Sequence, residues 1–298
     1  MNYTLPLEGD LILSRAKSGA KANLTGQKLL RKGRQSSASH VALVASPAYL
    51  IHATPADGVH FIGIHEFLCK SEYSEHWQVF RLNELTNRVA NDHWGTRTAV
   101  GKACDYFLLQ KYNYLIHVGG NKIQRLTKNR SFCSQLAAST YQRLEVATGL
   151  QIEDIEKTLP IDFEDAVRDT TIWTNVTDFY RSTMESVLSD EQLLEVLIEN
   201  ERLNASIAKK QILLECHLVS KLLEVAAFVR RTENRFGRLE ALVKQHANFV
   251  GIPVSVPTFG RNSLSALDAA LTIVREQNWV AGEQYDVFKK IQDIGNDG

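Results

Sequence analysis

The chain has 298 residues, 44% of them hydrophobic, and balances 34 Lys plus Arg against 34 Asp plus Glu. That length is enough for one large domain or two smaller ones with a substantial buried core. A formal net charge of zero gives no support to binding of nucleic acid or of an anionic membrane through overall charge, so we expect no nucleic-acid partner.

The cysteines and the apolar stretches indicate the compartment. Four scattered cysteines without a CxxC pair are typical of a reduced chain without a disulfide framework. Residues 1–10 lack the basic and apolar regions of a secretory signal, and the most apolar helical stretch, residues 212–229, is interrupted by charged residues. We expect a soluble protein made in the cytoplasm without a stable membrane span, and export by a specialised route stays open.

The first predicted strand covers residues 7–14 and leaves a turn at Gly9-Asp10. Residues 15–39 follow and contain six Lys or Arg residues between Lys17 and Arg34. We interpret this segment as a solvated loop or a short surface helix, and the alternative is contact with an anionic substrate or a membrane surface.

Two β-rich runs, residues 39–45 and 49–54, flank Ser46-Pro47 and predict a β-hairpin. If the turn is centred near Ser46, His40 lies directly opposite His52, with Cβ atoms roughly 4.5–5.5 Å apart. The two imidazoles would then touch each other or a common third group. A slip of one residue would place them on opposite faces of the sheet.

Residues 58–67 and 77–82 are predicted to form further strands, and residues 96–109 a helix. His60, His65 and Cys69 lie close together in the sequence, but their spacing fits no structural zinc pattern. We therefore expect no metal and no cofactor.

Cys133 lies where a helix is predicted to begin. A polar approach precedes it, and apolar residues at three-and-four spacing follow it up to Leu144. A helix N-terminus favours a thiolate over a thiol, and its free N–H groups can stabilise an oxyanion. Cys133 is therefore the candidate nucleophile, with His40 as candidate base and His52 as candidate orienting group.

From residue 182 onward the pattern becomes heptad-like, with almost no strand signal. We predict two regions: a catalytic domain over residues 1–181 and a helical bundle or appendage over residues 182–298. The helical region is interpreted as a cap or a dimerisation unit, and the alternative is a recognition unit for a protein partner.

Several short motifs in this order resemble the circularly permuted NlpC-like papain-fold cysteine hydrolases, which are related to the lecithin:retinol acyltransferase-like proteins. In that branch the histidine strand precedes the nucleophile helix. The motifs are Gly9-Asp10-Leu11-Ile12, Ser39-His40-Val41-Ala42, Ile51-His52-Ala53-Thr54, Phe80-Arg81-Leu82, Tyr112-Asn113-Tyr114 and Phe132-Cys133-Ser134-Gln135.

The resemblance implies an α+β fold with an antiparallel sheet, and it implies a triad of Cys133, His40 and His52. Many permuted NlpC-like sequences carry a glutamate where His52 stands, which alters the electrostatics of the triad. The implied activity is thiol-dependent hydrolysis of an amide bond in a peptide, a peptidoglycan stem peptide or an isopeptide-like substrate. One alternative is a lipid esterase or acyltransferase using the same triad, and another is a non-catalytic binding protein on a degenerate hydrolase fold.

Overall fold

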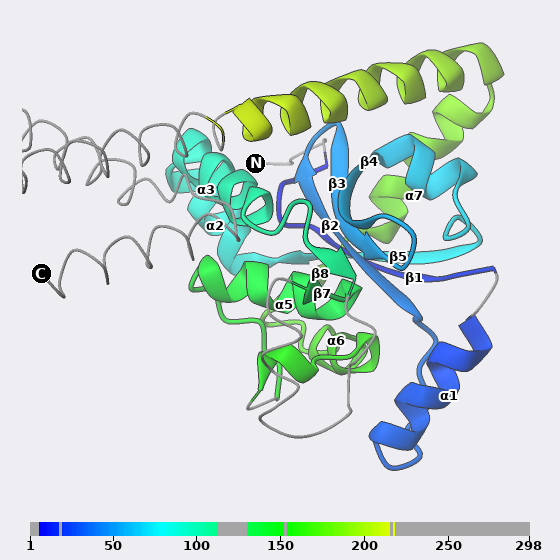
Figure 1. Ribbon diagram of the computed structural model, residues 1–298, viewed down its shortest axis with the longest axis vertical. Coiled ribbons are helices and arrows are strands. Elements are labelled where there is room, and N and C mark those ends of the chain that lie inside the picture. The colour runs from blue at the N-terminus through cyan, green and yellow to red at the C-terminus, as the bar shows by residue number, and fades with distance from the viewer. Residues whose placement is uncertain (1–5, 18–19, 113–129, 152–153, 215–216, 218–298) are drawn as a thin grey trace, which may run out of the picture. The chain divides into compact units, whose positions relative to one another are not determined.

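The computed structural model in Figure 1 describes residues 6–17, 20–112, 130–151, 154–214 and 217. The chain divides into two compact units, Met1–Gln211 and Ile212–Gly298. The description that follows concerns the first unit. The helices predicted from residue 218 onward lie outside the described residues.

A six-stranded sheet is the centre of the first unit, and all its neighbouring strands are antiparallel. In the order β4-β3-β2-β1-β5-β8, its strands are Gly58–Gly63, Tyr49–Thr54, His40–Ser46, Leu11–Arg15, His76–Leu82 and Trp173–Asn175. A separate pair of two-residue strands, β6 (Lys111–Tyr112) and β7 (Arg130–Ser131), is parallel. The predicted hairpin is β2–β3.

One face of the sheet is covered by α2 (Asn83–Asn91), α3 (His93–Asp105), α5 (Cys133–Arg143) and α6 (Pro160–Ala166). Alternation along each strand directs Val41 and Leu43 of β2 into this core, where Leu136 of α5 meets them. The apolar spacing that predicted α5 therefore forms its buried stripe.

The opposite face is covered by the π-helical turn η1 (Glu66–Lys70) and by α7 (Thr177–Leu188). Ala42 and Val44, the alternate residues of β2, face this side. A further helix over residues 191–214 packs Leu194 and Ile198 against Val187 of α7. Residues 182–211 thus belong to the first compact unit, whereas the predicted boundary lies at residue 181.

The Gly9-Asp10 turn ties the two faces together. Asp10 is 1% exposed and accepts hydrogen bonds from Arg81 of β5, at 2.8 and 2.7 Å, and from the Tyr180 hydroxyl of α7, at 2.7 Å. The Tyr141 hydroxyl of α5 donates to the carbonyl of Gly9, also at 2.8 Å. Because a buried carboxylate must be paired, these contacts hold β1, β5, α5 and α7 in one arrangement.

Two further elements complete the described part: α1 (Ala20–Leu30) and the 3-10 turn η2 (Ile155–Lys157). The basic segment therefore contains the surface helix that was one of its predicted forms. The predicted mixed α+β class with an antiparallel sheet is confirmed. Among the described residues, no helix is long and apolar enough to cross a membrane.

Candidate functional site

Cys133 is the first residue of α5, as predicted from the sequence, and it is 3% exposed. The backbone N–H groups of Val41, Ser134 and Cys133 itself lie where they favour a negative charge on the sulfur. Burial has the larger effect, and it raises the pKa of the Cys133 thiol to about 11. The free protein therefore holds a neutral thiol, whereas the helix position alone predicted a thiolate.

The β2–β3 register corrects the predicted cross-strand pair. Ala42, and not His40, lies directly opposite His52, because the chain turns at Pro47-Ala48, where Ser46 pairs with Tyr49, and a β-bulge between Val44 and Ser46 then shifts the ladder back by one residue. His40 and Ala42 share a face of β2, so a displacement by two residues keeps the histidines on one face as diagonal neighbours. His40 Nε2 lies 3.0 Å from His52 Nδ1.

A third histidine extends this contact. His60 lies directly opposite His52 on β4, and its Nε2 is 2.9 Å from His52 Nε2. The Nδ1 of His60 lies 3.1 Å from the carbonyl oxygen of Gly58. Sequence analysis considered His60 only as a zinc ligand. The signal was the turn at residues 55–57: Thr54 pairs with Gly58, so His52 and His60 are equidistant from Ala56.

Aromatic rings enclose the two inner histidines. The Tyr73 ring stacks on His40 with centroids 4.0 Å apart, and Phe67 stacks on Tyr73 at 5.2 Å. Burial lowers the pKa of His40 to about 3, and it lowers the pKa of His52 well below its ordinary value. Both imidazoles are therefore neutral near pH 7, and Tyr73 is a site residue that sequence analysis did not identify.

Cys133 and His40 belong to opposite faces of the sheet. The thiol belongs to the core that contains Val41, whereas His40 packs with Phe67 and Tyr73. Val41, the residue after His40 in β2, has its N–H beside the sulfur of Cys133. Within the described residues, no hydrogen bond joins Cys133 to His40, and His40 Nδ1 makes none either.

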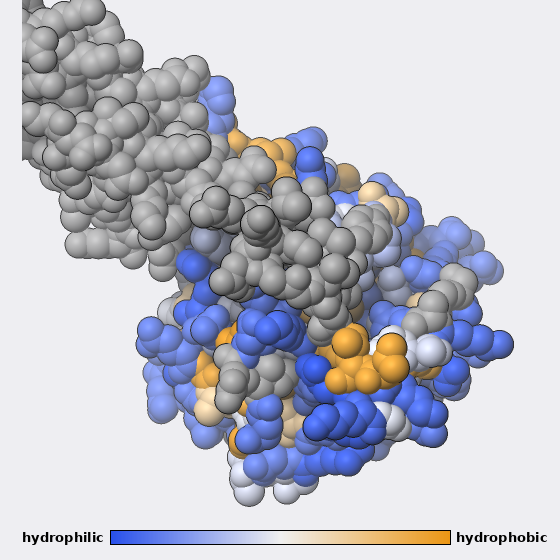
Figure 2. All heavy atoms as spheres, turned by 60° about the horizontal axis from the view of Figure 1, so that its bottom comes forward, coloured by the Kyte–Doolittle hydropathy of each residue, from blue (hydrophilic) through white to orange (hydrophobic). Residues whose placement is uncertain are grey.

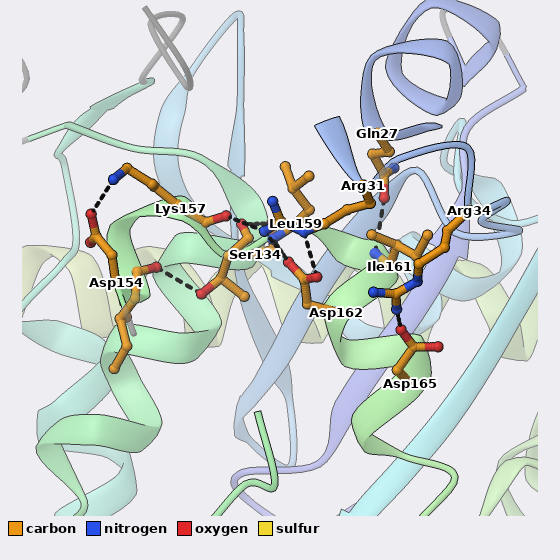
Figure 3. A network of polar contacts seen from close by, with 12 residues as sticks. Gln27, Arg31, Arg34, Ser134, Asp154, Lys157, Leu159, Ile161, Asp162 and Asp165 are labelled. Atoms are coloured by element: carbon orange, nitrogen blue, oxygen red, sulfur yellow. Dashed lines mark hydrogen bonds and ion pairs between the residues drawn. The ribbon is translucent and has the colours of Figure 1, made fainter. Parts of the chain in front are cut away.

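A polar network connects α1 to the start of α5 (Figure 3). Arg31, directly after α1, donates two hydrogen bonds to Asp162 of α6, at 2.8 and 2.7 Å, and a third to the carbonyl of Lys157. The hydroxyl of Ser134, next to Cys133, donates to the carbonyl of Thr158 at 2.8 Å. The basic segment thus has an internal role, because Arg31 holds the end of α1 on the segment, residues 157–162, that Ser134 of α5 also contacts.

The zinc alternative for His60, His65 and Cys69 has no geometric support. His60 pairs with His52, His65 Nδ1 lies 2.6 Å from Glu201 Oε1, and Cys69 contacts Met184. In the described part of the chain, no group of three or more His, Cys, Asp or Glu residues is arranged to hold a metal ion.

Comparisons of the chain with protein-family models, with curated proteins and with solved structures found no match.

Proposed function

We propose that the protein is a thiol hydrolase that cleaves an amide bond, with Cys133 as nucleophile, His40 as general base and His52 as the group that orients His40. The observation that carries the proposal is the position of the Cys133 thiol. Cys133 begins α5 beside the N–H of Val41. His40, the residue before Val41, has its Nε2 bonded to His52, and its Nδ1 makes no hydrogen bond within the part of the chain that the structure describes. The resemblance to permuted NlpC-like hydrolases adds the amide class of substrate.

The reaction begins from neutral groups. Nδ1 of His40 takes the thiol proton as the sulfur attacks the carbonyl carbon, which avoids a preformed ion pair that burial disfavours. The free N–H groups at the start of α5 and the N–H of Val41 stabilise the negative charge that develops. His40 then gives its proton to the leaving amine, and a thioester remains on Cys133. Water, deprotonated by His40, attacks the thioester carbonyl; the C–S bond then breaks, the acid leaves, and His40 returns the proton to the sulfur of Cys133.

The test uses the full chain, a panel of amide and ester substrates, and intact-mass detection of the acyl-enzyme. We expect an added acyl mass in the wild type that maps to Cys133 and disappears in Cys133→Ala. Cys104→Ala is the matched control, since Cys104 is a buried thiol of the same core but lies within α3. Turnover that persists in Cys133→Ala would refute the proposal.

A lipid esterase or acyltransferase is the second candidate, and α1 provides the observation that favours it. Leu29 is 81% exposed and Leu30 40% exposed at the end of this helix, beside the exposed Lys28 and Lys32. Exposed apolar residues next to lysines are typical of helices that contact a lipid surface. On the face of the molecule drawn in Figure 2, the visible hydrophobic residues form patches between hydrophilic ones. Release of fatty acid from lipids without cleavage of amides would favour this candidate.

A binding protein on a degenerate hydrolase fold is the third candidate. The raised pKa of Cys133 and the lowered pKa of His40 are what an inert buried pair would also show. The absence of any acyl-enzyme across the substrate panel, with an unchanged phenotype for Cys133→Ala, would favour this candidate.

A further inference from the structure

We infer that His60 is a positioning residue: by donating its Nδ1–H to the carbonyl of Gly58, it sets the direction of the hydrogen bonds in the His40-His52-His60 chain and leaves Nδ1 of His40 without a proton. This inference rests on the proposed function, in which that nitrogen is the base.

The direction follows from what each atom can do. A carbonyl oxygen only accepts, so His60 Nδ1, 3.1 Å from Gly58 O, must carry the proton. A neutral imidazole has one N–H, so His60 Nε2 is an acceptor, and His52 Nε2, 2.9 Å away, must be the donor. His52 Nδ1 is then an acceptor, and His40 Nε2, 3.0 Å away, donates to it. The remaining nitrogen of His40 has a free lone pair.

The reverse direction is disfavoured at its far end. It would place a lone pair of His60 Nδ1 against the lone pairs of the Gly58 carbonyl oxygen. These two part-buried acceptors would then face each other with no hydrogen between them. Without His60, His52 has no partner that selects one of its two tautomers. His40 would then populate both forms, and only one of them can accept the thiol proton.

The backbone holds the Gly58 carbonyl in place. Gly58 has a φ of +70°, and a Cβ at this position would collide with the carbonyl of Gln110. The next residue, Val59, donates its N–H to Gln110 at 2.8 Å and accepts from Leu109 at 3.0 Å. The two hydrogen bonds of Val59 thus hold the neighbouring Gly58 carbonyl, which is the acceptor at the end of the histidine hydrogen-bond chain.

The test measures tautomers directly, by long-range ¹H–¹⁵N correlation spectra of the full chain labelled at histidine, with each signal assigned by single substitution. In the wild type we expect His40 and His52 to carry the proton on Nε2 and His60 to carry it on Nδ1. His60→Leu removes the acceptor, and we expect a mixture of His40 tautomers and a fall of about tenfold in the Cys133 acylation rate.

Two further variants control for structural damage. His60→Gln keeps a polar group near the position of Nε2 but cannot donate to the Gly58 carbonyl, so its amide can either accept from His52 or donate to it. We expect His60→Gln, like His60→Leu, to give a mixture of His40 tautomers, which shows that loss of polarity is not the cause. His76→Leu, at an exposed histidine that begins β5, should change neither measurement.

The inference is overturned if His60 carries its proton on Nε2 in the wild type, or if the His40 tautomer is the same in His60→Leu. If the tautomers are as stated while no acyl-enzyme forms in the wild type, the proposed function fails and the assignment of the hydrogen-bond chain stands.

Discussion

The reactivity of Cys133 towards iodoacetamide separates a neutral site from an ion-paired one. With the pKa of the thiol at about 11, roughly 3 in 10,000 molecules carry a thiolate at pH 7.5. A free cysteine with a pKa of about 8.5 is about 10% ionised at that pH. We therefore expect alkylation of Cys133 to be about 300-fold slower than that of a free peptide thiol, before any further slowing by restricted access.

The assay follows alkylation of the Cys133 peptide by mass spectrometry between pH 6 and 10, with the half-buried Cys69 as an internal reference. The rate should rise about tenfold for each pH unit without reaching a plateau. In His40→Gln we expect the same profile, because a neutral His40 does not stabilise the thiolate, but a large loss of substrate turnover. A plateau below pH 8 that is lost in His40→Gln would show an ion pair and refute the argument that burial dominates.

Three predictions concern stability, measured by urea unfolding. The pKa of His40 is lowered in the folded state, so the unfolded chain binds the proton first as the pH falls below about 6.5. This residue should therefore lower the free energy of unfolding by about 2 kcal/mol at pH 5 relative to neutral pH. A free energy of unfolding that does not change with pH would contradict this. Asp10→Asn should lower the free energy of unfolding by about 3 kcal/mol, because it removes the carboxylate that pairs with the buried Arg81. Glu84→Gln, in a more exposed ion pair, should lower it by less than about 1 kcal/mol. Gly58→Ala should lower the free energy of unfolding by about 2 kcal/mol or more, because Gly58 has a positive φ and the backbone oxygen of Gln110 occupies the place of a Cβ. An unchanged free energy of unfolding would show that the turn can relax.

Local pattern was enough to predict several elements of this protein. The apolar spacing after Cys133 predicts α5 and its first residue, since helix periodicity and the polar approach to a helix are properties of neighbouring residues. The Ser-Pro turn between two β-rich runs predicts the β2–β3 hairpin for the same reason. The shared face of His40 and His52 survives the register error, because side chains alternate with a period of two residues.

Tertiary structure decided what depends on segments distant in the sequence. The position of the turn at Pro47-Ala48 and a one-residue β-bulge together set the hairpin register, so Ala42 opposes His52. Pairing of β3 with β4 brings His60 onto His52, and the loop before β5 supplies Tyr73, which covers His40. The protonation states followed from this packing: a helix start by itself favours a thiolate, but burial in the assembled core raises the pKa of Cys133. Solvent exclusion is a property of the assembled fold, and for that reason the sequence alone proposed Cys133, His40 and His52 as candidates but could not predict their charges.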